Sequence, residues 1–578
     1  MKRVILELSK FKKELFLIII STLGTTLATL GLPALLRGII DEAIPNKDYA
    51  KLFTTTGLMV VFVVIGILAG IWGSKLSAQV SMGVGRNMRS EIFNKVQNFS
   101  QSEIDAFSTS SLITRTNNDI TQIQTFLNQV LRIAIMAPIM CICGIALAVS
   151  TSPRLSAVLV ISVPVMAIIL VIIGKIAIPL STSIQTKLDN INLVIREKLT
   201  GVRVVRAFGT QKFEADKFEK INTDYKKTSK KMQRVSNLLL PFMILILSMT
   251  IAIILYMAYN QSVYQGVKYT AGELMAIIEY ILMILMAVVM MTLVFLLLPR
   301  ATTSAKRAQE ILSSVNEIDN AEEPKDNTEK QGYLEFKNVS FTYKGADVPA
   351  IQGLSFSAKP GETTAIIGGT GMGKTTIVNL IPRLYDVTEG QVLVDGIDVR
   401  DYDLSVLRKK IGFVPQKAVL FKGTIESNLR FGDDDPTEER IEKAVEIAQS
   451  TEFVMKKEDG YESVVAQGGS NFSGGQKQRL CIARAVVRKP EIYVFDDSFS
   501  ALDFKTDKNL RAALAEETDN ATVVIVAQRV STIMEADRII VVEQGKIAGI
   551  GTHHELLKTC DVYKEIVASQ MSEEEMNK

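Results

Sequence analysis

The sequence predicts a membrane α-helical domain of six long transmembrane helices, fused to an α/β domain that carries a phosphate-binding loop. Three features of the 578 residues predict it: long uncharged apolar runs before residue 310, short apolar runs alternating with helical segments after 332, and a glycine-rich segment ending in lysine and threonine at 368–375. A hydrophobic content of 47% excludes a disordered or collagen-like chain, and four cysteines are too few for a disulfide scaffold.

The two halves of the chain differ in charge, although the formal net charge is only +3. Residues 1–310 hold 33 Lys/Arg and 18 Asp/Glu, a balance of +15, whereas residues 311–578 hold 32 Lys/Arg and 44 Asp/Glu, a balance of −12. Basic side chains at the cytoplasmic ends of membrane helices account for the positive half, so no nucleic-acid partner is predicted.

Six apolar stretches are long enough to cross a bilayer, whose core of about 30 Å needs roughly 20 helical residues. They define a predicted transmembrane domain over residues 1–315, embedded among membrane lipids. The predicted spans are 15–36, 52–74, 133–153, 155–174, 237–258 and 277–299.

Basic residues outside these stretches predict how the domain is oriented. The segment 175–234, around the connection between the fourth and fifth spans, carries 14 Lys/Arg, and five more precede the first span. Such segments stay in the cytoplasm by the positive-inside rule. Six spans then return the chain to the cytoplasm, so the sequence predicts a multi-pass protein with both termini cytoplasmic.

Two features of the spans each admit two interpretations. Glu279, near the outer start of the sixth span, contacts either a proton or cationic substrate, or the membrane interface. Methionines are abundant in the third, fifth and sixth spans. They line a promiscuous apolar cavity or simply pack against lipid.

The second half begins after a polar, charged linker at 316–332 and forms a predicted nucleotide-binding domain over 333–578. Short β-runs alternate with helices there, which is typical of an α/β domain around a largely parallel sheet. The predicted strands are 334–339, 363–367, 391–394, 411–415, 492–495, 523–526 and 538–542.

A phosphate-binding loop follows the apolar strand at 363–367. Glycines allow backbone N–H groups to curl around a phosphate at a helix N-terminus, Lys374 neutralises phosphate charge, and Thr375 supplies a hydroxyl to Mg²⁺. ATP and Mg²⁺ are therefore the predicted ligands. The nucleotide-binding residues are Gly368, Gly369, Thr370, Gly371, Met372, Gly373, Lys374, Thr375 and Thr376.

Two aspartates follow the apolar run Ile492-Tyr493-Val494-Phe495. A carboxylate at the end of a buried strand is where a phosphate-loop enzyme holds Mg²⁺, which assigns that role to Asp496. Asp497 comes directly after it. Upstream lies the tetrapeptide Ser473-Gly474-Gly475-Gln476.

This tetrapeptide resembles the signature motif of ATP-binding cassette (ABC) proteins, and nearly the whole chain resembles an ABC exporter half-transporter. The resemblance implies that Tyr343 stacks on adenine, that Gln416 contacts Mg²⁺, and that Asp503 belongs to the D-loop in Ser500-Ala501-Leu502-Asp503. It also implies short coupling helices around 101–108 and 212–218. The signature residues Ser473, Gly474, Gly475 and Gln476 would contact ATP bound to a partner.

Three departures from the family pattern affect the chemistry. Asp497 stands where the family has a catalytic glutamate, and a carboxylate one methylene shorter reaches less far toward a water molecule. Gln528 stands at the switch-histidine position and cannot carry a positive charge. The two histidines, His553 and His554, lie near the C-terminus, and Val465-Ala466-Gln467-Gly468-Gly469 replaces a segment that commonly reads Gly-Glu-Arg-Gly.

The resemblance is therefore closest to the degenerate-site subunit of heterodimeric multidrug ABC exporters. It implies an ATPase-coupled translocase whose activity resides mainly at the site built with a second, related half-transporter. Lipophilic or drug-like compounds are the implied cargo, and a bacterial plasma membrane is the implied location. A homodimeric lipid or peptide exporter and an ATP-gated regulator or channel remain alternatives.

Overall fold

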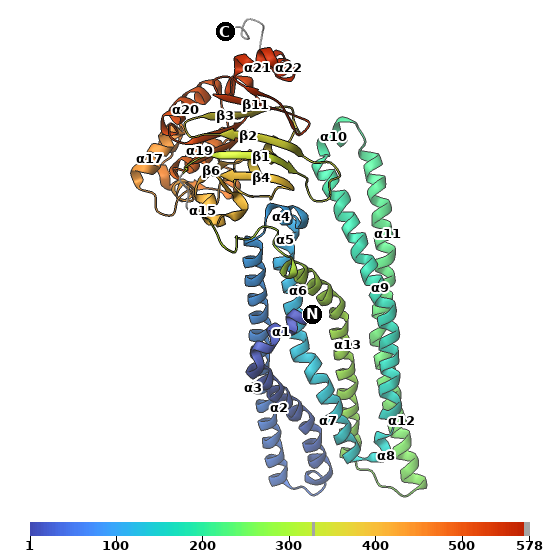
Figure 1. Cartoon of the computed structure of the whole chain (residues 1–578). Coiled ribbons are helices and arrows are strands. Elements are labelled where there is room, and N and C mark those ends of the chain that lie inside the picture. The colour runs from blue at the N-terminus through green and yellow to red at the C-terminus, as the bar shows by residue number, and fades with distance from the viewer. Residues whose placement is uncertain (326–329, 571–578) are drawn as a thin grey trace. The chain divides into compact units, whose positions relative to one another are not determined.

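The computed structural model describes residues 1–325 and 330–570, except for the side chains at 293, 295 and 296 (Figure 1). The chain divides into two compact units. Unit 1 comprises residues 1–97 and 109–314, and unit 2 comprises residues 98–108 and 315–578.

Unit 1 is helical and contains six helical segments that are long and apolar enough to cross a membrane, as the sequence predicts. They contain 42 to 54 residues, or about 63 to 81 Å of helix, against a bilayer core of about 30 Å. Each segment therefore extends well beyond the membrane. The segments are Lys2–Ala43, Tyr49–Gln97, Thr109–Thr151, Pro153–Thr200, Gln211–Tyr264 and Ala271–Ser313.

The third segment is built from shorter helices joined by two wide turns, Arg115–Asp119 and Val130–Ala134, and the first segment ends in a third wide turn, Ile39–Ala43. The helices are α1 (Lys2–Leu8), α2 (Lys12–Gly38), α3 (Tyr49–Gln97), α5 (Thr109–Thr114), α6 (Ile120–Gln129), α7 (Ile135–Thr151), α8 (Pro153–Ser156), α9 (Leu159–Thr200), α10 (Val202–Ala207), α11 (Gln211–Asn237), α12 (Leu239–Tyr264) and α13 (Ala271–Ser313).

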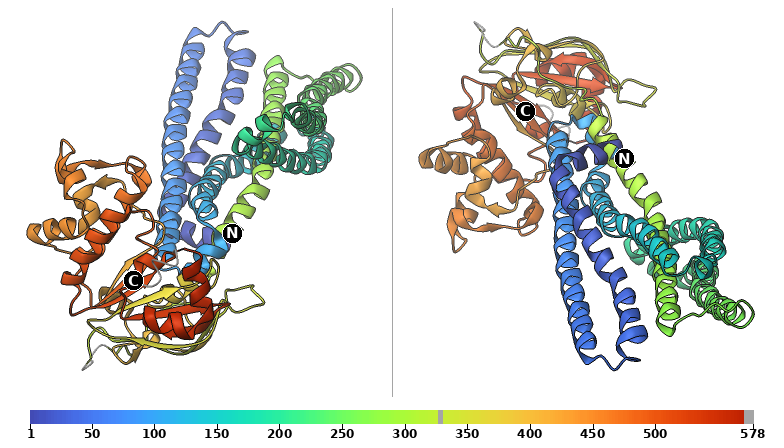
Figure 2. Two further views of the ribbon diagram at one scale, coloured as in Figure 1. Left: turned by 90° about the horizontal axis from the view of Figure 1, so that it is seen from above. Right: turned by 90° about the horizontal axis from the view of Figure 1, so that it is seen from below.

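The helices of unit 1 pack in antiparallel pairs: α2 along α3, α7 along α13, and α9 along α11 (Figure 2). The buried residues Ile277, Ile281 and Ile284 of α13 pack with Ile254 of α12 in one apolar cluster. Large apolar side chains such as Ile161 remain exposed on the surface of unit 1, which is the pattern expected of a lipid-facing wall.

Polar contacts fasten α13 at both ends. At its start, Asp41 accepts hydrogen bonds from the Gly272 backbone N–H at 2.8 Å and the Thr270 hydroxyl at 2.5 Å. Near its other end, Asp119 accepts from the Ser304 hydroxyl at 2.8 Å and from Arg307 at 2.7 Å. These contacts tie the sixth spanning segment to the first and to the third.

Unit 2 contains a four-stranded antiparallel sheet, a six-stranded mixed sheet and a two-stranded ribbon (Figure 1). The first has the order β2-β1-β4-β5, the second has the order β12-β11-β3-β10-β9-β6, and the ribbon pairs β7 with β8. The strands are β1 (Leu334–Phe341), β2 (Ile351–Ala358), β3 (Thr363–Ile367), β4 (Glu389–Val394), β5 (Ile397–Asp398), β6 (Ile411–Val414), β7 (Gly423–Thr424), β8 (Val464–Val465), β9 (Ile492–Asp496), β10 (Thr522–Val526), β11 (Arg538–Glu543) and β12 (Lys546–Gly551).

Five neighbouring strands of the six-stranded sheet are parallel, and only the edge strand β12 is antiparallel. The largely parallel sheet predicted from the sequence is therefore present. The antiparallel sheet was not predicted as a separate layer. The helices of unit 2 are α4 (Gln101–Phe107), α14 (Lys374–Leu380), α15 (Leu404–Lys409), α16 (Ile425–Arg430), α17 (Glu438–Ile447), α18 (Thr451–Met455), α19 (Gly474–Val487), α20 (Phe504–Glu517), α21 (His553–Thr559) and α22 (Asp561–Ala568).

The short helix α4 confirms the helix predicted around 101–108. Ser100 caps it, because its hydroxyl and backbone N–H both lie 2.6 Å from the Glu103 carboxylate. The second predicted short helix, at 212–218, is wrong: those residues begin the long helix α11. The short helix is α10 instead, set off by Gly201 and by Gly209 with φ +65°.

Candidate nucleotide site

The phosphate-loop residues connect the buried strand β3 to α14 in the manner that the motif requires. Gly371 and Gly373 have φ of +81° and +93°, which other residues rarely adopt. A Cβ on Gly373 would lie 2.6 Å from the Ala350 carbonyl oxygen, and one on Gly368 would lie 2.2 Å from that of Val542. Sterics therefore restrict these positions to glycine.

Lys374 lies beneath this loop and is 8% exposed. Its ammonium group donates to the carbonyl oxygens of Gly368 at 2.8 Å and Gly369 at 2.7 Å. Burial lowers the pKa of Lys374, while the nearby Asp497 and Asp496 oppose that effect. The side chain is thus held against the backbone that would surround a phosphate group.

Oxygen ligands suited to Mg²⁺ lie beside the loop. The Thr375 hydroxyl is 3.3 Å from Oδ1 of Asp496, which ends β9 and is 2% exposed. Burial raises the pKa of Asp496, so a cation is the partner that would favour its charged form. A hydroxyl and a carboxylate are hard oxygen donors, and they fit the magnesium role predicted for Thr375 and Asp496.

The carboxylate of Asp497 lies between two amides. Its Oδ2 accepts a hydrogen bond from Nε2 of Gln528 at 2.9 Å and a longer one from Nε2 of Gln416 at 3.4 Å. Asp497, Gln528 and Gln416 follow β9, β10 and β6, whose carboxyl ends share one sheet edge. The structure therefore brings together three residues that the sequence assigned separately.

Asp497 also has an unusual backbone conformation, with φ +48°. Asp and Asn adopt this left-handed region more readily than most residues. Its N–H donates to the Val526 carbonyl at 2.9 Å, and its carbonyl accepts from the Ser500 hydroxyl at 2.9 Å. Burial raises the pKa of the Asp497 carboxyl group. The side chain is thus fixed by its backbone as well as by the two amides.

Tyr343 lies two residues after the end of β1, and its hydroxyl is 2.9 Å from that of Thr376. Its ring contacts the ring of Tyr385 edge-on, with 5.5 Å between centroids. The Tyr385 hydroxyl donates to Asp105 of α4 at 2.8 Å, and burial together with Asp105 raises the pKa of Tyr385. Tyr343, which is predicted to stack on adenine, is thus connected to α4 through the side chain of Tyr385.

A second connection runs through Glu317. Its carboxylate accepts from Lys344 and from the Ser102 hydroxyl, both at 2.5 Å, and its backbone N–H donates to Glu103 at 2.7 Å. A cavity of about 600 Å³ lies among α4, Tyr343 and Tyr385. Sequence reasoning missed Tyr385, Asp105 and Glu317, because no local motif marks a contact between such distant positions.

The signature residues do not join this cluster. Ser473 caps α19, with its hydroxyl accepting from the Gln476 N–H at 3.3 Å and its own N–H donating to the Gln476 side chain at 3.0 Å. A Cβ on Gly474 would meet no atom within 4 Å. Asp503 caps α20 through the Thr506 N–H, which lowers the pKa of Asp503. No hydrogen bond among the described residues links 473–476 to the phosphate loop.

Comparison with known proteins shows which family this chain matches. The profile described as "ABC transporter transmembrane region" matches residues 15–288, and the profile described as "ABC transporter" matches residues 351–500. An uncharacterised ABC transporter ATP-binding protein of Mycobacterium tuberculosis is 40% identical over 564 residues, covering 97% of this chain and 96% of the relative.

Other similar proteins carry more specific descriptions. An ATP-dependent lipid A-core flippase of Mannheimia succiniciproducens is 32% identical over 572 residues, covering 99% of this chain and 97% of that protein. A solved bacterial Atm1-family ABC exporter with ATP bound superimposes with a TM-score of 0.80 at 25% identity, covering 98% of this chain and 99% of that one.

Proposed function

This chain belongs to the ABC transporter family as an exporter half-transporter, and from that premise we propose that its own nucleotide site retains ATP while hydrolysing it slowly. The signature residues 473–476 complete the faster site of a partner chain. The observation that carries the proposal is the Asp497 carboxylate, which accepts a hydrogen bond from Gln528 at 2.9 Å.

ATP retention rests on the intact phosphate-binding side. The loop glycines present backbone N–H groups, Lys374 supplies positive charge, and the Tyr343 ring offers a stacking surface for adenine. Thr375, Asp496 and Gln416 would hold Mg²⁺, which would neutralise phosphate charge.

Slow hydrolysis rests on the opposite side of the site. A general base must reach the proton it abstracts within about 2.6–3.2 Å. Asp497 is one methylene shorter than glutamate, and its Oδ2 is already hydrogen-bonded by two amides. Gln528 is neutral at any pH, so it cannot place a positive charge near a developing negative one.

The signature segment supports the partner role. Ser473 and Gly474 are exposed, and a Cβ at Gly474 would have open space within this chain. ABC exporters work as dimers, and a related half-transporter with an intact base would gain its signature contacts from this chain. A homodimer is the second candidate, and the full-length similarity to lipid A-core flippases supports it and a lipid cargo.

Unit 2 can transmit motion through α4. This helix is continuous in the chain with α3 and α5 of unit 1, yet its Asp105, Ser102 and Glu103 bind residues of unit 2. Rearrangement of unit 2 would therefore pull on two membrane segments. We place both termini, and the cytoplasmic ends of the membrane segments, on the inner side of a bacterial plasma membrane. The proposed cargo is lipophilic or drug-like compounds.

The test is to isolate a tagged chain from its native membrane and to measure ATPase turnover. We expect a second, related half-transporter to co-purify, and the chain alone to turn over at least about tenfold more slowly than the pair. Rapid turnover by a pure homodimer would overturn the assignment. Flux down a gradient with a non-hydrolysable ATP analogue would favour a channel instead.

A further inference from the structure

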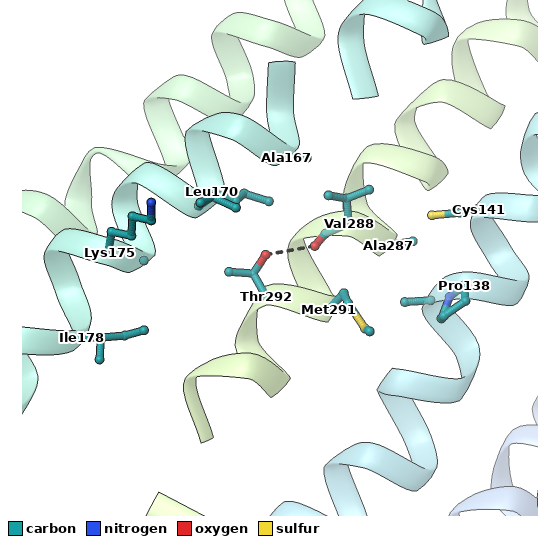
Figure 3. A pocket seen from close by; sticks show the side chains of 13 residues that line it. Pro138, Cys141, Ala167, Leu170, Lys175, Ile178, Ala287, Val288, Met291 and Thr292 are labelled. Carbon is teal, nitrogen blue, oxygen red and sulfur yellow. Dashed lines mark hydrogen bonds between the residues drawn. The ribbon is translucent and has the colours of Figure 1, made fainter. Parts of the chain in front are cut away.

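A cavity of about 450 Å³ lies in unit 1 between α7, α9 and α13 (Figure 3). Its walls are mostly apolar, with Cys141 of α7, Leu170 of α9 and Val288 of α13 among the lining residues. Among these lining residues, the polar side chains are Lys175 and Thr292, and the Cys141 thiol is weakly polar. The volume falls within the range of about 300–1,000 Å³ that is usual for small-molecule sites.

Lys175 is the only charged residue among the described residues of the lining. It makes no hydrogen bond or ion pair with the residues described in 1–325 and 330–570. The Thr292 hydroxyl donates to the Val288 carbonyl at 3.1 Å, within its own helix, which leaves its oxygen lone pairs available (Figure 3). The cavity thus offers a cation and a hydroxyl on an otherwise apolar wall.

Lys175 lies near the inner end of the fourth span. Counting from Leu159, where α9 begins, it is 16 residues along the helix, or about 24 Å from that start, and it directly follows the predicted span 155–174. Its side chain lines the cavity and is also exposed, so it can reach a ligand there. A lysine that merely extends toward the interface is the competing explanation.

We propose that this cavity binds an amphiphile with an anionic headgroup, a phosphate or a carboxylate, whose charge pairs with Lys175. The apolar body of the ligand lies against α7 and α13, and the Thr292 hydroxyl can turn its proton from Val288 to the headgroup. The proposal rests on the export function above and names the substrate class. Charge complementarity favours an anion, because none of the described residues that line the cavity is acidic.

The test uses the purified full-length complex in nanodiscs of zwitterionic lipid. Equilibrium binding is measured for two single-chain probes with the same fluorescent tail, one phosphate-headed and one choline-headed. We expect Lys175→Met to weaken the phosphate probe at least about tenfold and to leave the choline probe unchanged, while Lys175→Arg retains binding.

The matched control is Lys75→Met, because Lys75 is also an exposed lysine near the inner end of a span, on α3, and does not line the cavity. Unchanged ATP affinity checks that each variant is folded. Equal loss with Lys75→Met would show mere attraction to the membrane surface and would overturn the proposal. Equal binding by Lys175→Met and the unmodified protein would also overturn it.

Competition then identifies the source of the ligand. If added phosphatidylglycerol displaces the phosphate probe, the ligand is a bilayer lipid. If only a soluble anionic amphiphile displaces it, the ligand enters as a free compound. Probe binding needs no ATP hydrolysis, so this proposal can fail while the assignment of the slow site stands, and the reverse is equally possible.

Discussion

The two sides of the nucleotide site differ in what their residues can do. On the phosphate side, Lys374, Thr375 and the loop glycines are the groups that we propose hold the nucleotide. On the side where water would be activated, Asp497 and Gln528 bind each other at 2.9 Å. If the proposed slow site is correct, ATP binding and ATP hydrolysis are separated within one fold, because they depend on different side chains, even where two of these, Asp496 and Asp497, are neighbours at the end of β9.

The largest expected effect is on the phosphate side. Lys374→Ala removes a buried cation that lies against the loop, so we expect ATP affinity of this chain to fall by at least about a hundredfold. Titration with a fluorescent ATP analogue measures it. Lys359→Ala, at an exposed position outside the site, is the control and should bind normally. A loss of ATP affinity of less than about threefold would show that Lys374 is not part of the ATP-binding site.

The next effect concerns the partner's site. Gly474→Ala adds a methyl group that meets nothing within this chain. That methyl group would, however, prevent the signature segment from approaching closely the ATP bound to a partner. We expect turnover of the pair to fall roughly a hundredfold, with ATP binding and melting temperature of this chain unchanged. Turnover within twofold of the unmodified pair would contradict the signature assignment.

A smaller effect is expected at Asp497. Asp497→Asn preserves the left-handed backbone and leaves a side chain that still meets Gln528, so ATPase turnover of the pair should change by less than about twofold. Replacing both residues, as Asp497→Glu with Gln528→His, should instead raise hydrolysis at this site. If Asp497→Asn abolished ATPase turnover as completely as mutation of the partner's base does, the assignment of turnover to the partner's site would be wrong.

The dependence of ATPase turnover on pH also tests whether Asp497 acts as the general base. Burial raises the pKa of Asp497 above its ordinary 3.8, so a base at this position would lose activity as pH falls through that raised value. Because we assign turnover to the partner's site, the acid limb of the profile should be identical in Asp497→Asn and the unmodified pair. Disappearance of that limb in the variant would identify Asp497 as the base.

Much of this site could be predicted because its signals are local. The phosphate loop, Asp496 and the signature are short motifs at fixed positions beside apolar strands, and the six spans are long enough to be recognised from composition. Strands β2 and β12 escaped prediction because polar and glycine residues interrupt their apolar pattern, as in Ile351–Ala358 and Lys546–Gly551.

The parts that could not be predicted depend on contacts between distant residues. Gln528 and Asp497 were each recognised as substitutions, but their hydrogen bond follows from the register of β9 beside β10. Tyr385 and Asp105 are 280 positions apart. No periodicity or local motif encodes such a pair, which arises only once α4 is incorporated into unit 2.

The smallest expected effect tests this contact. Tyr385→Phe removes the hydrogen bond to Asp105 and keeps the ring that meets Tyr343, so ATP affinity should be unchanged while stimulation of ATPase by cargo falls about two- to threefold. Tyr402→Phe is the matched control, because it removes a hydrogen bond from a tyrosine hydroxyl to the Val394 carbonyl of β4. Each loses about 0.5–1.5 kcal/mol of stability. Equal stimulation in both variants would show that the link from Tyr343 through Tyr385 to α4 carries no coupling.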